Sequence, residues 1–216
     1  MLRKTFLLLA AICSVGASQA TVNADIVIAE NVVTGPGSGL AVFTGNSRGQ
    51  SFTATQSGRL TTIELQVWRS INGTPTDDLN VSLTTLNSSG TPDLSNVLAT
   101  RTLSAAEIPT TSFSTALVPV DFSSSMVELM ANTDYAILLT SLTGTLPDWY
   151  LWTSGAGTAY SDGIGFSGNT SFVADTTFDS GFRVNGTAVV PEPASALLML
   201  SGVCGVGLLR RRSRNR

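Results

Sequence analysis

The segment Arg59–Trp68, RLTTIELQVW, decides the fold class. Ile63, Leu65 and Val67 alternate with polar residues, so an extended chain would present one apolar side and one polar side. Trp68 falls on the polar side or at the end of this stretch. The period of two therefore predicts a β-strand with one face against a core.

Similar short stretches recur along the chain, separated by turn clusters such as Asn72-Gly73 and Ser89-Gly90. No long apolar stripe with helical period interrupts them, and the one helix candidate, Ser104–Glu107, is short. The sequence therefore predicts an all-β domain over residues 25–189, built as an antiparallel β-sandwich. The further expected strands are Ile26–Val33, Leu40–Phe43, Ser51–Thr55, Leu79–Leu83, Val97–Leu103, Leu117–Phe122, Tyr135–Leu142, Trp149–Trp152, Ser171–Ala174 and Gly181–Val184.

The middle of the chain is acidic. Between Asp25 and Val190 there are fourteen acidic residues and five arginines, a net charge of −9. Nucleic acid requires a basic surface, so no nucleic-acid partner is expected. An acidic body without thiols is typical of a soluble domain outside the cell.

The first 24 residues have the three parts of a secretory signal peptide. Arg3 and Lys4 are positive, Phe6–Val15 is apolar, and small residues follow. The apolar run is too short to span a bilayer, so we expect a signal helix that is cleaved after Ala20 or Ala24.

Residues 190–216 form a second targeting segment. Residues 194–209 are sixteen uncharged residues, which as a helix would cover about 24 Å and, with flanking arginines, span a membrane once. The basic tail after it is expected to stay in the cytoplasm. The sequence thus predicts export of the acidic middle with the tail as an anchor.

Pro191-Glu192-Pro193, the apolar run and the terminal arginines together resemble the PEP-CTERM sorting signal of Gram-negative bacteria. The resemblance implies that an exosortase-type membrane protease is a partner and acts at Pro191, Glu192 and Pro193. It also implies that the protein is transiently anchored in the inner membrane and is then found at the cell surface or outside the cell, often with exopolysaccharide. A permanent tail anchor is the alternative.

A second resemblance covers Gln50–Thr53, Leu60–Trp68, Gly90–Pro92, Asn132–Tyr135 and Phe178–Val184. In this order they are similar to the jelly-roll ectodomains labelled choice-of-anchor domains, which resemble carbohydrate-binding modules in fold. The resemblance implies a jelly-roll-like sandwich and no particular ligand.

Catalytic motifs are weak. Gly45–Gly49 matches G-x-S-x-G, but Ser47 has no histidine anywhere in the chain to act as its base. Gly163–Gly168 matches G-x-G-x-x-G without the flanking strand and helix of a dinucleotide site, so we expect a glycine-rich loop. We therefore predict that the protein is not an enzyme. A glycosidase with two carboxylates remains an alternative.

Metal sites are limited to oxygen ligands. Zinc lacks ligands, because the chain has no histidine and both cysteines lie in the terminal apolar runs. We therefore expect no cofactor. Calcium is the alternative, because it takes only oxygen ligands, with Asp77, Asp78, Asp175 and Asp179 as candidate donors, although no EF-hand pattern is present.

Aromatic residues are the leading candidates for ligand binding. Trp68 and the run Trp149-Tyr150-Leu151-Trp152 carry rings that, if exposed on a sheet, would stack on a sugar. Tryptophans on one exposed face would favour glycan binding; buried tryptophans would favour a structural role. The sequence predicts a non-enzymatic protein bound to extracellular polysaccharide or to another cell-surface component, with a self-associating matrix or surface protein as the alternative.

Overall fold

The computed structural model describes residues 24–34, 37–71, 73, 75–110, 116–142, 148–156 and 160–188. The predicted signal helix, the predicted membrane helix at 194–209, Ala20 and Pro191–Pro193 lie outside these ranges. Within the described ranges no helix is long and apolar enough to cross a membrane.

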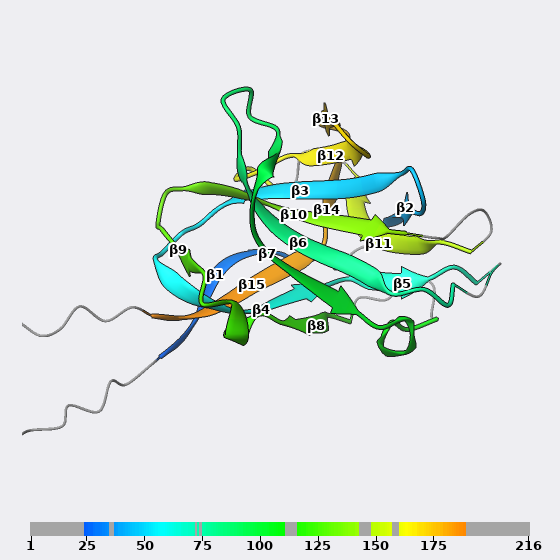
Figure 1. The fold of residues 1–216 in the computed structure, drawn as a ribbon, viewed down its shortest axis with the longest axis horizontal. Helices are drawn as coiled ribbons and strands as arrows, with labels where there is room; N and C mark the ends of the chain where they lie inside the picture. The colour runs from blue at the N-terminus through cyan, green and yellow to red at the C-terminus, as the bar shows by residue number, and fades with distance from the viewer. Residues whose placement is uncertain are drawn as a thin grey trace, which may run out of the picture.

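Three antiparallel sheets make up the domain (Figure 1). The five-stranded sheet contains, in order, β1 (Asp25–Asn31), β15 (Phe182–Ala188), β4 (Gly58–Leu65) and β8 (Val118–Asp121), with β9 (Glu128–Leu129) beside β4. The six-stranded sheet contains β13 (Phe172–Asp175), β12 (Gly165–Gly168), β3 (Ser47–Thr53), β10 (Asp134–Ser141), β6 (Leu79–Leu86) and β7 (Pro92–Leu103). The four-stranded sheet contains β14 (Phe178–Ser180), β11 (Tyr150–Ala156) and β2 (Ser38–Val42), with β5 (Val67–Arg69) beside β11.

Two strands continue from the five-stranded into the four-stranded sheet. Only Gln66 separates β4 from β5, and only Gly181 separates β14 from β15. Gln66 N donates to Gly181 O at 3.1 Å, and Gly181 N donates to Thr153 O at 2.8 Å. The two sheets are therefore hydrogen-bonded into one layer.

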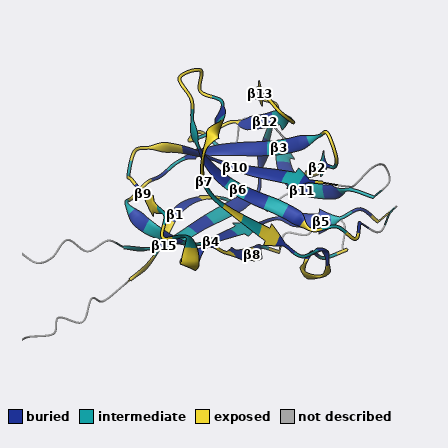
Figure 2. Ribbon diagram, in the orientation of Figure 1, coloured by how far each residue is buried: buried dark blue, intermediate teal, exposed yellow. Residues whose placement is uncertain are grey.

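The core lies between this layer and the six-stranded sheet. Phe52, Val81 and Ile137 come from the six-stranded sheet, and Ile63 and Trp152 from the opposite layer; all five belong to one buried cluster. Figure 2 shows the buried positions along the strands that face each other. The predicted all-β, antiparallel class is confirmed, and two layers on one core fit the predicted sandwich.

The predicted strand Arg59–Trp68 is broken by Gln66. The Gln66 side chain is buried and forms a pair of hydrogen bonds with Val33: Val33 N donates to Oε1 at 2.8 Å, and Nε2 donates to Val33 O at 3.1 Å. A glutamine amide can replace a backbone partner in this way, which lets the chain turn into the next sheet without leaving polar groups unpaired.

The sequence predicts a glycine-rich loop at Gly163–Gly168. This prediction is wrong for Gly165–Gly168, because these residues form strand β12. Its glycines allow close approach of backbones. A Cβ on Gly168 would lie 1.9 Å from Ser171 O, and one on Gly165 would lie 2.6 Å from Phe178 O. The motif is therefore explained by packing. The expected short Ser104–Glu107 element is confirmed as the 3-10 turn η1 (Ala105–Glu107), with a capping box from Ser104. Ser123–Ser125 form a further 3-10 turn, η2.

Candidate functional site

The proposed stacking role of Tyr150 and Trp152 is wrong. Both rings are buried, and they lie on the core-facing side of β11. Trp152 Nε1 donates to Gly181 O at 2.9 Å, and the Tyr150 hydroxyl donates to Asp77 O. Their polar atoms are thus used inside the sandwich, as is usual for large aromatics in a core.

Trp68 is also buried, at 5% exposure, because the strands around it cover its ring. It pairs with Leu151 across β5 and β11, and a Cβ added to Gly39 would lie 3.0 Å from Trp68 Cζ2. Trp149 is half-buried, with its ring 6.2 Å from that of Phe43. The four aromatic residues therefore do not form one exposed stacking surface.

The four candidate calcium ligands do not converge. Asp77 accepts from Tyr150 at the start of β11, whereas Asp179 pairs with Gly155 near its other end. Asp78 accepts from Ala105 N at 3.3 Å. Across the described ranges no group of three or more acidic, histidine or cysteine side chains is placed to hold a metal ion.

Asp179 instead belongs to a polar cluster between the layers. Asp179 is 4% exposed; Gln50 Nε2 lies 3.3 Å from its Oδ1, and Tyr160 N donates to its Oδ2 at 3.1 Å. Gln50 Oε1 in turn accepts from Ser180 N at 2.8 Å. These contacts tie β14 to β3 from within the sandwich.

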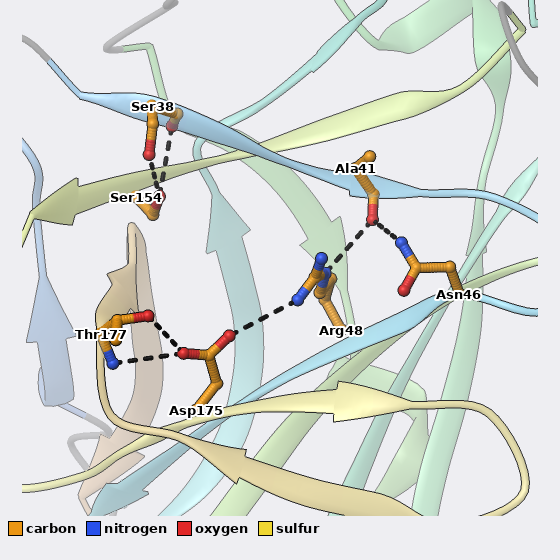
Figure 3. Close-up of polar contacts among 7 residues, drawn as sticks. All are labelled: Ser38, Ala41, Asn46, Arg48, Ser154, Asp175 and Thr177. Atoms are coloured by element: carbon orange, nitrogen blue, oxygen red, sulfur yellow. Dashed lines mark hydrogen bonds and ion pairs between the residues drawn. The ribbon is translucent and has the colours of Figure 1, made fainter.

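Arg48 contacts Asp175 and Ala41 (Figure 3). Its Nε donates to Ala41 O at 3.3 Å, and its Nη1 lies 3.7 Å from Asp175 Oδ2. Burial lowers the pKa of Arg48, and the charge of Asp175 opposes that shift. Asp175 is oriented by Thr177, whose backbone N donates to its other oxygen at 3.2 Å. This arrangement joins β2, β3 and β13, so we assign it a structural role.

A cleft of about 350 Å³ lies on the outer face of the six-stranded sheet. We call it the hydroxyl cleft. Ser51 and Thr53 point outward because the residue between them, Phe52, faces the core. Its lining includes Ser51 and Thr53 from β3, Asp134 from β10, Leu86 from β6, and Asp162 and Ile164 from the loop before β12.

Hydrogen bonds fix the walls of the hydroxyl cleft. Thr53 Oγ1 donates to Asp134 Oδ1 at 2.7 Å, and Thr53 N donates to Asp162 O at 2.8 Å. Ile164 N donates to Ser51 Oγ at 2.8 Å. A Cβ on Gly163 would lie 1.9 Å from Ser51 O, so only glycine lets the loop approach β3 this closely.

Sequence reasoning missed this cleft. Asp134 and Asp162 stand in turn-like contexts, Asn132-Thr133-Asp134 and Ser161-Asp162-Gly163, which predict loops and no ligand. Only the pairing of β3 with both β10 and the loop before β12 brings them to one place.

No protein-family model matches the chain, and no match is found among the curated proteins.

Proposed function

We propose that this is an exported, exosortase-processed protein of the cell surface or exopolysaccharide matrix, whose jelly-roll-like sandwich binds polysaccharide without catalysis. Export and sorting are supported by the signal-peptide pattern and by Pro191-Glu192-Pro193 followed by an uncharged run and arginines. The hydroxyl cleft carries the binding part of the proposal.

The chemistry of the hydroxyl cleft suits a sugar. The carboxylates of Asp134 and Asp162 and the exposed hydroxyl of Ser161 offer acceptors and donors for sugar hydroxyls, and Leu86 and Ile164 offer apolar surface for a ring face. Its volume of about 350 Å³ is at the lower end of the range for small-molecule sites. The support for glycan binding thus lies in this cleft and not in the aromatic rings.

The non-catalytic part of the proposal is supported by Ser47. This serine of the G-x-S-x-G match is 3% exposed and is the first residue of β3, paired with Gly168 of β12. A nucleophile elbow requires an exposed hydroxyl on a strand-to-helix turn and an activating base. Ser47 has neither feature.

The test is calorimetric titration of the purified exported chain with four probes: cellohexaose, xylohexaose, mannohexaose and chitohexaose. We expect one of these glycans to bind, and Asp134→Asn to weaken that binding about ten-fold or more, because a hydrogen bond to a charged group is worth roughly 1.5–3 kcal/mol. Glu128→Gln is the matched control, since it removes the same charge from an exposed position on β9.

Absence of binding to all four hexaoses and to a wider glycan array would reject the glycan-binding proposal. Turnover of a bound hexaose that is lost in Asp134→Asn would instead show a glycosidase.

A second candidate function is self-association, favoured by the open edge of the six-stranded sheet. β13 is its last strand, and Val173 on it is 67% exposed. An edge strand with an apolar side chain is a template for pairing with another copy. Concentration-dependent assembly in light scattering without glycan, abolished by Val173→Lys, would support this function.

A further inference from the structure

A second cleft, of about 510 Å³, lies on the outer face of the five-stranded sheet. Val27 of β1, Asn185 of β15 and Thr62 of β4 form one row across it, because Asn185 pairs with both of the others. Asp25 and Thr61 complete its polar lining, and we call it the amide cleft.

Irregular pairing shapes the amide cleft. The register shifts between Val27 and Ala29 in β1 and between Asn185 and Gly186 in β15. Gly186 belongs to the lining, and a Cβ there would lie 2.6 Å from Arg59 O, so the backbones approach closely. Bulges re-aim side chains and are frequent beside binding sites.

The two clefts present similar chemistry. The hydroxyl cleft combines carboxylates, hydroxyls and two apolar side chains; the amide cleft combines the Asp25 carboxylate, threonine hydroxyls, the Asn185 amide and Val27, which is 41% exposed. Both sets offer donors and acceptors to neutral hydroxyl groups beside an apolar surface.

The two clefts open on opposite sides of the molecule. In the hydroxyl cleft Ser51 and Thr53 flank core-facing Phe52, and in the amide cleft Thr62 and Asn185 adjoin core-facing Ile63 and Val184. Each set therefore points away from the shared core. Since packed sheets are about 10 Å apart, the clefts are separated by at least that thickness.

From this back-to-back arrangement we infer that each molecule holds two polysaccharide chains, one per cleft, and cross-links them. The inference rests on the proposed glycan-binding function and adds a second site and a bivalent mode of action. A short oligosaccharide cannot occupy both clefts at once, because the sandwich lies between them.

Stoichiometry tests the inference. Calorimetry and native mass spectrometry of the exported chain, with whichever of the four hexaoses binds, should give two ligands per chain. Thr62→Val, which keeps the side-chain shape and strand propensity, should leave one ligand, as should Asp134→Asn. Thr100→Val, on exposed strand β7 outside both clefts, is the matched control and should keep two.

Cross-linking gives an independent readout. The wild type should precipitate or gel the soluble polymer of the same sugar, whereas each single-cleft variant should bind the polymer but not precipitate it. A second substitution, Asn185→Ala, checks that the effect belongs to the amide cleft.

A stoichiometry of one that Thr62→Val and Asn185→Ala leave unchanged would overturn the bivalent inference and leave the proposed function standing. Absence of binding by the wild type to all four hexaoses and to the wider glycan array would overturn both.

Discussion

Gln66 and Gly181 form the contact on which the joined layer depends. Gln66 is fully buried, and its amide pairs with both backbone groups of Val33. A Cβ on Gly181 would lie 1.9 Å from Gln66 Oε1, so glycine is required for the amide to take this position. Neither residue could be assigned this role from sequence, because each is separated from its partners by tens of residues.

Gly181→Ala should destabilise the domain by about 2–4 kcal/mol, because the added methyl displaces a buried amide and leaves polar groups of Val33 unpaired. Gly155→Ala is the control: the nearest atom to its added Cβ is Val33 Cγ2 at 3.9 Å, so its effect should stay within about 0.5 kcal/mol. Urea unfolding of both variants measures the difference, and equal stability of the two would contradict the argument.

Tyr150 predicts a dependence of stability on alkaline pH. Burial raises the pKa of Tyr150 to about 12, whereas the ordinary value is 10.0. The folded state therefore holds the phenol proton more tightly than the unfolded chain does. The resulting stabilisation is complete below pH 10 and is lost as the pH rises through about 12.

Denaturant unfolding at pH 8, 10 and 11.5 should show this fall for the wild type. Tyr150→Phe should be less stable at pH 8, since it loses the bond to Asp77 O, but its decline above pH 10 should be shallower. An unchanged pH slope in Tyr150→Phe would show that another group is responsible. Tyr160→Phe is a necessary comparison, because burial raises the pKa of Tyr160 as well.

At the scale of elements, strands with strict alternation could be predicted from sequence, and short glycine-containing strands could not. The stretch Leu79–Leu83 reads as a strand by itself and is part of β6. By contrast, β12 contains Gly165 and Gly168, whose local preference is for turns. It is a strand because two neighbours, β3 and β13, pair with it.

The dependence on pairing between distant strands also explains why the clefts could not be predicted from the sequence. Sequence alternation correctly places Tyr150 and Trp152 on one face of their strand, but it does not show that this face is the core. The hydroxyl cleft needs the pairing of β3 with residues more than eighty positions away, which no local pattern encodes. The periodicity of a strand predicts which side chains share a face of that strand. The pairing of distant strands decides which polar side chains lie close together.

Gly168→Ala should disrupt the β12–β13 hairpin and leave the rest of the sandwich folded. The added Cβ would lie 1.9 Å from Ser171 O and 2.9 Å from Phe172 Cα. Both are backbone atoms, so relieving the clash requires a movement of the backbone. Hydrogen exchange should accelerate within β12 and β13 while protection of β4 and β10 is retained. Ser167→Ala, in the same strand, should exchange like the wild type; uniform loss of protection in Gly168→Ala would mean that the hairpin is part of the global folding unit.

At the scale of the whole molecule, the two ends of the domain lie together. Ala188 N donates to Ala24 O at 2.9 Å, and Asp25 pairs with Thr187. The described chain leaves the sandwich at both ends on one side (Figure 1). The two predicted targeting segments would therefore follow from neighbouring points of the sandwich, and their proposed removal would leave the strands of the sandwich intact.

This geometry favours one of the two predicted signal-cleavage sites. The carbonyl of Ala24 accepts the hydrogen bond from Ala188 N at the end of the β1–β15 ladder. Cleavage after Ala24 would remove this carbonyl with the signal peptide, and the hydrogen bond would be lost. Cleavage after Ala20 would keep it. At the other end β15 finishes at Ala188, before Pro191-Glu192-Pro193, so processing there spares every residue of the strand. We expect intact-mass spectrometry of the native protein to show a chain that starts at Thr21 and ends near Pro191–Pro193. A chain that starts at Asp25 would contradict the argument from the ladder, and one that retains Arg216 would identify the tail as a permanent anchor.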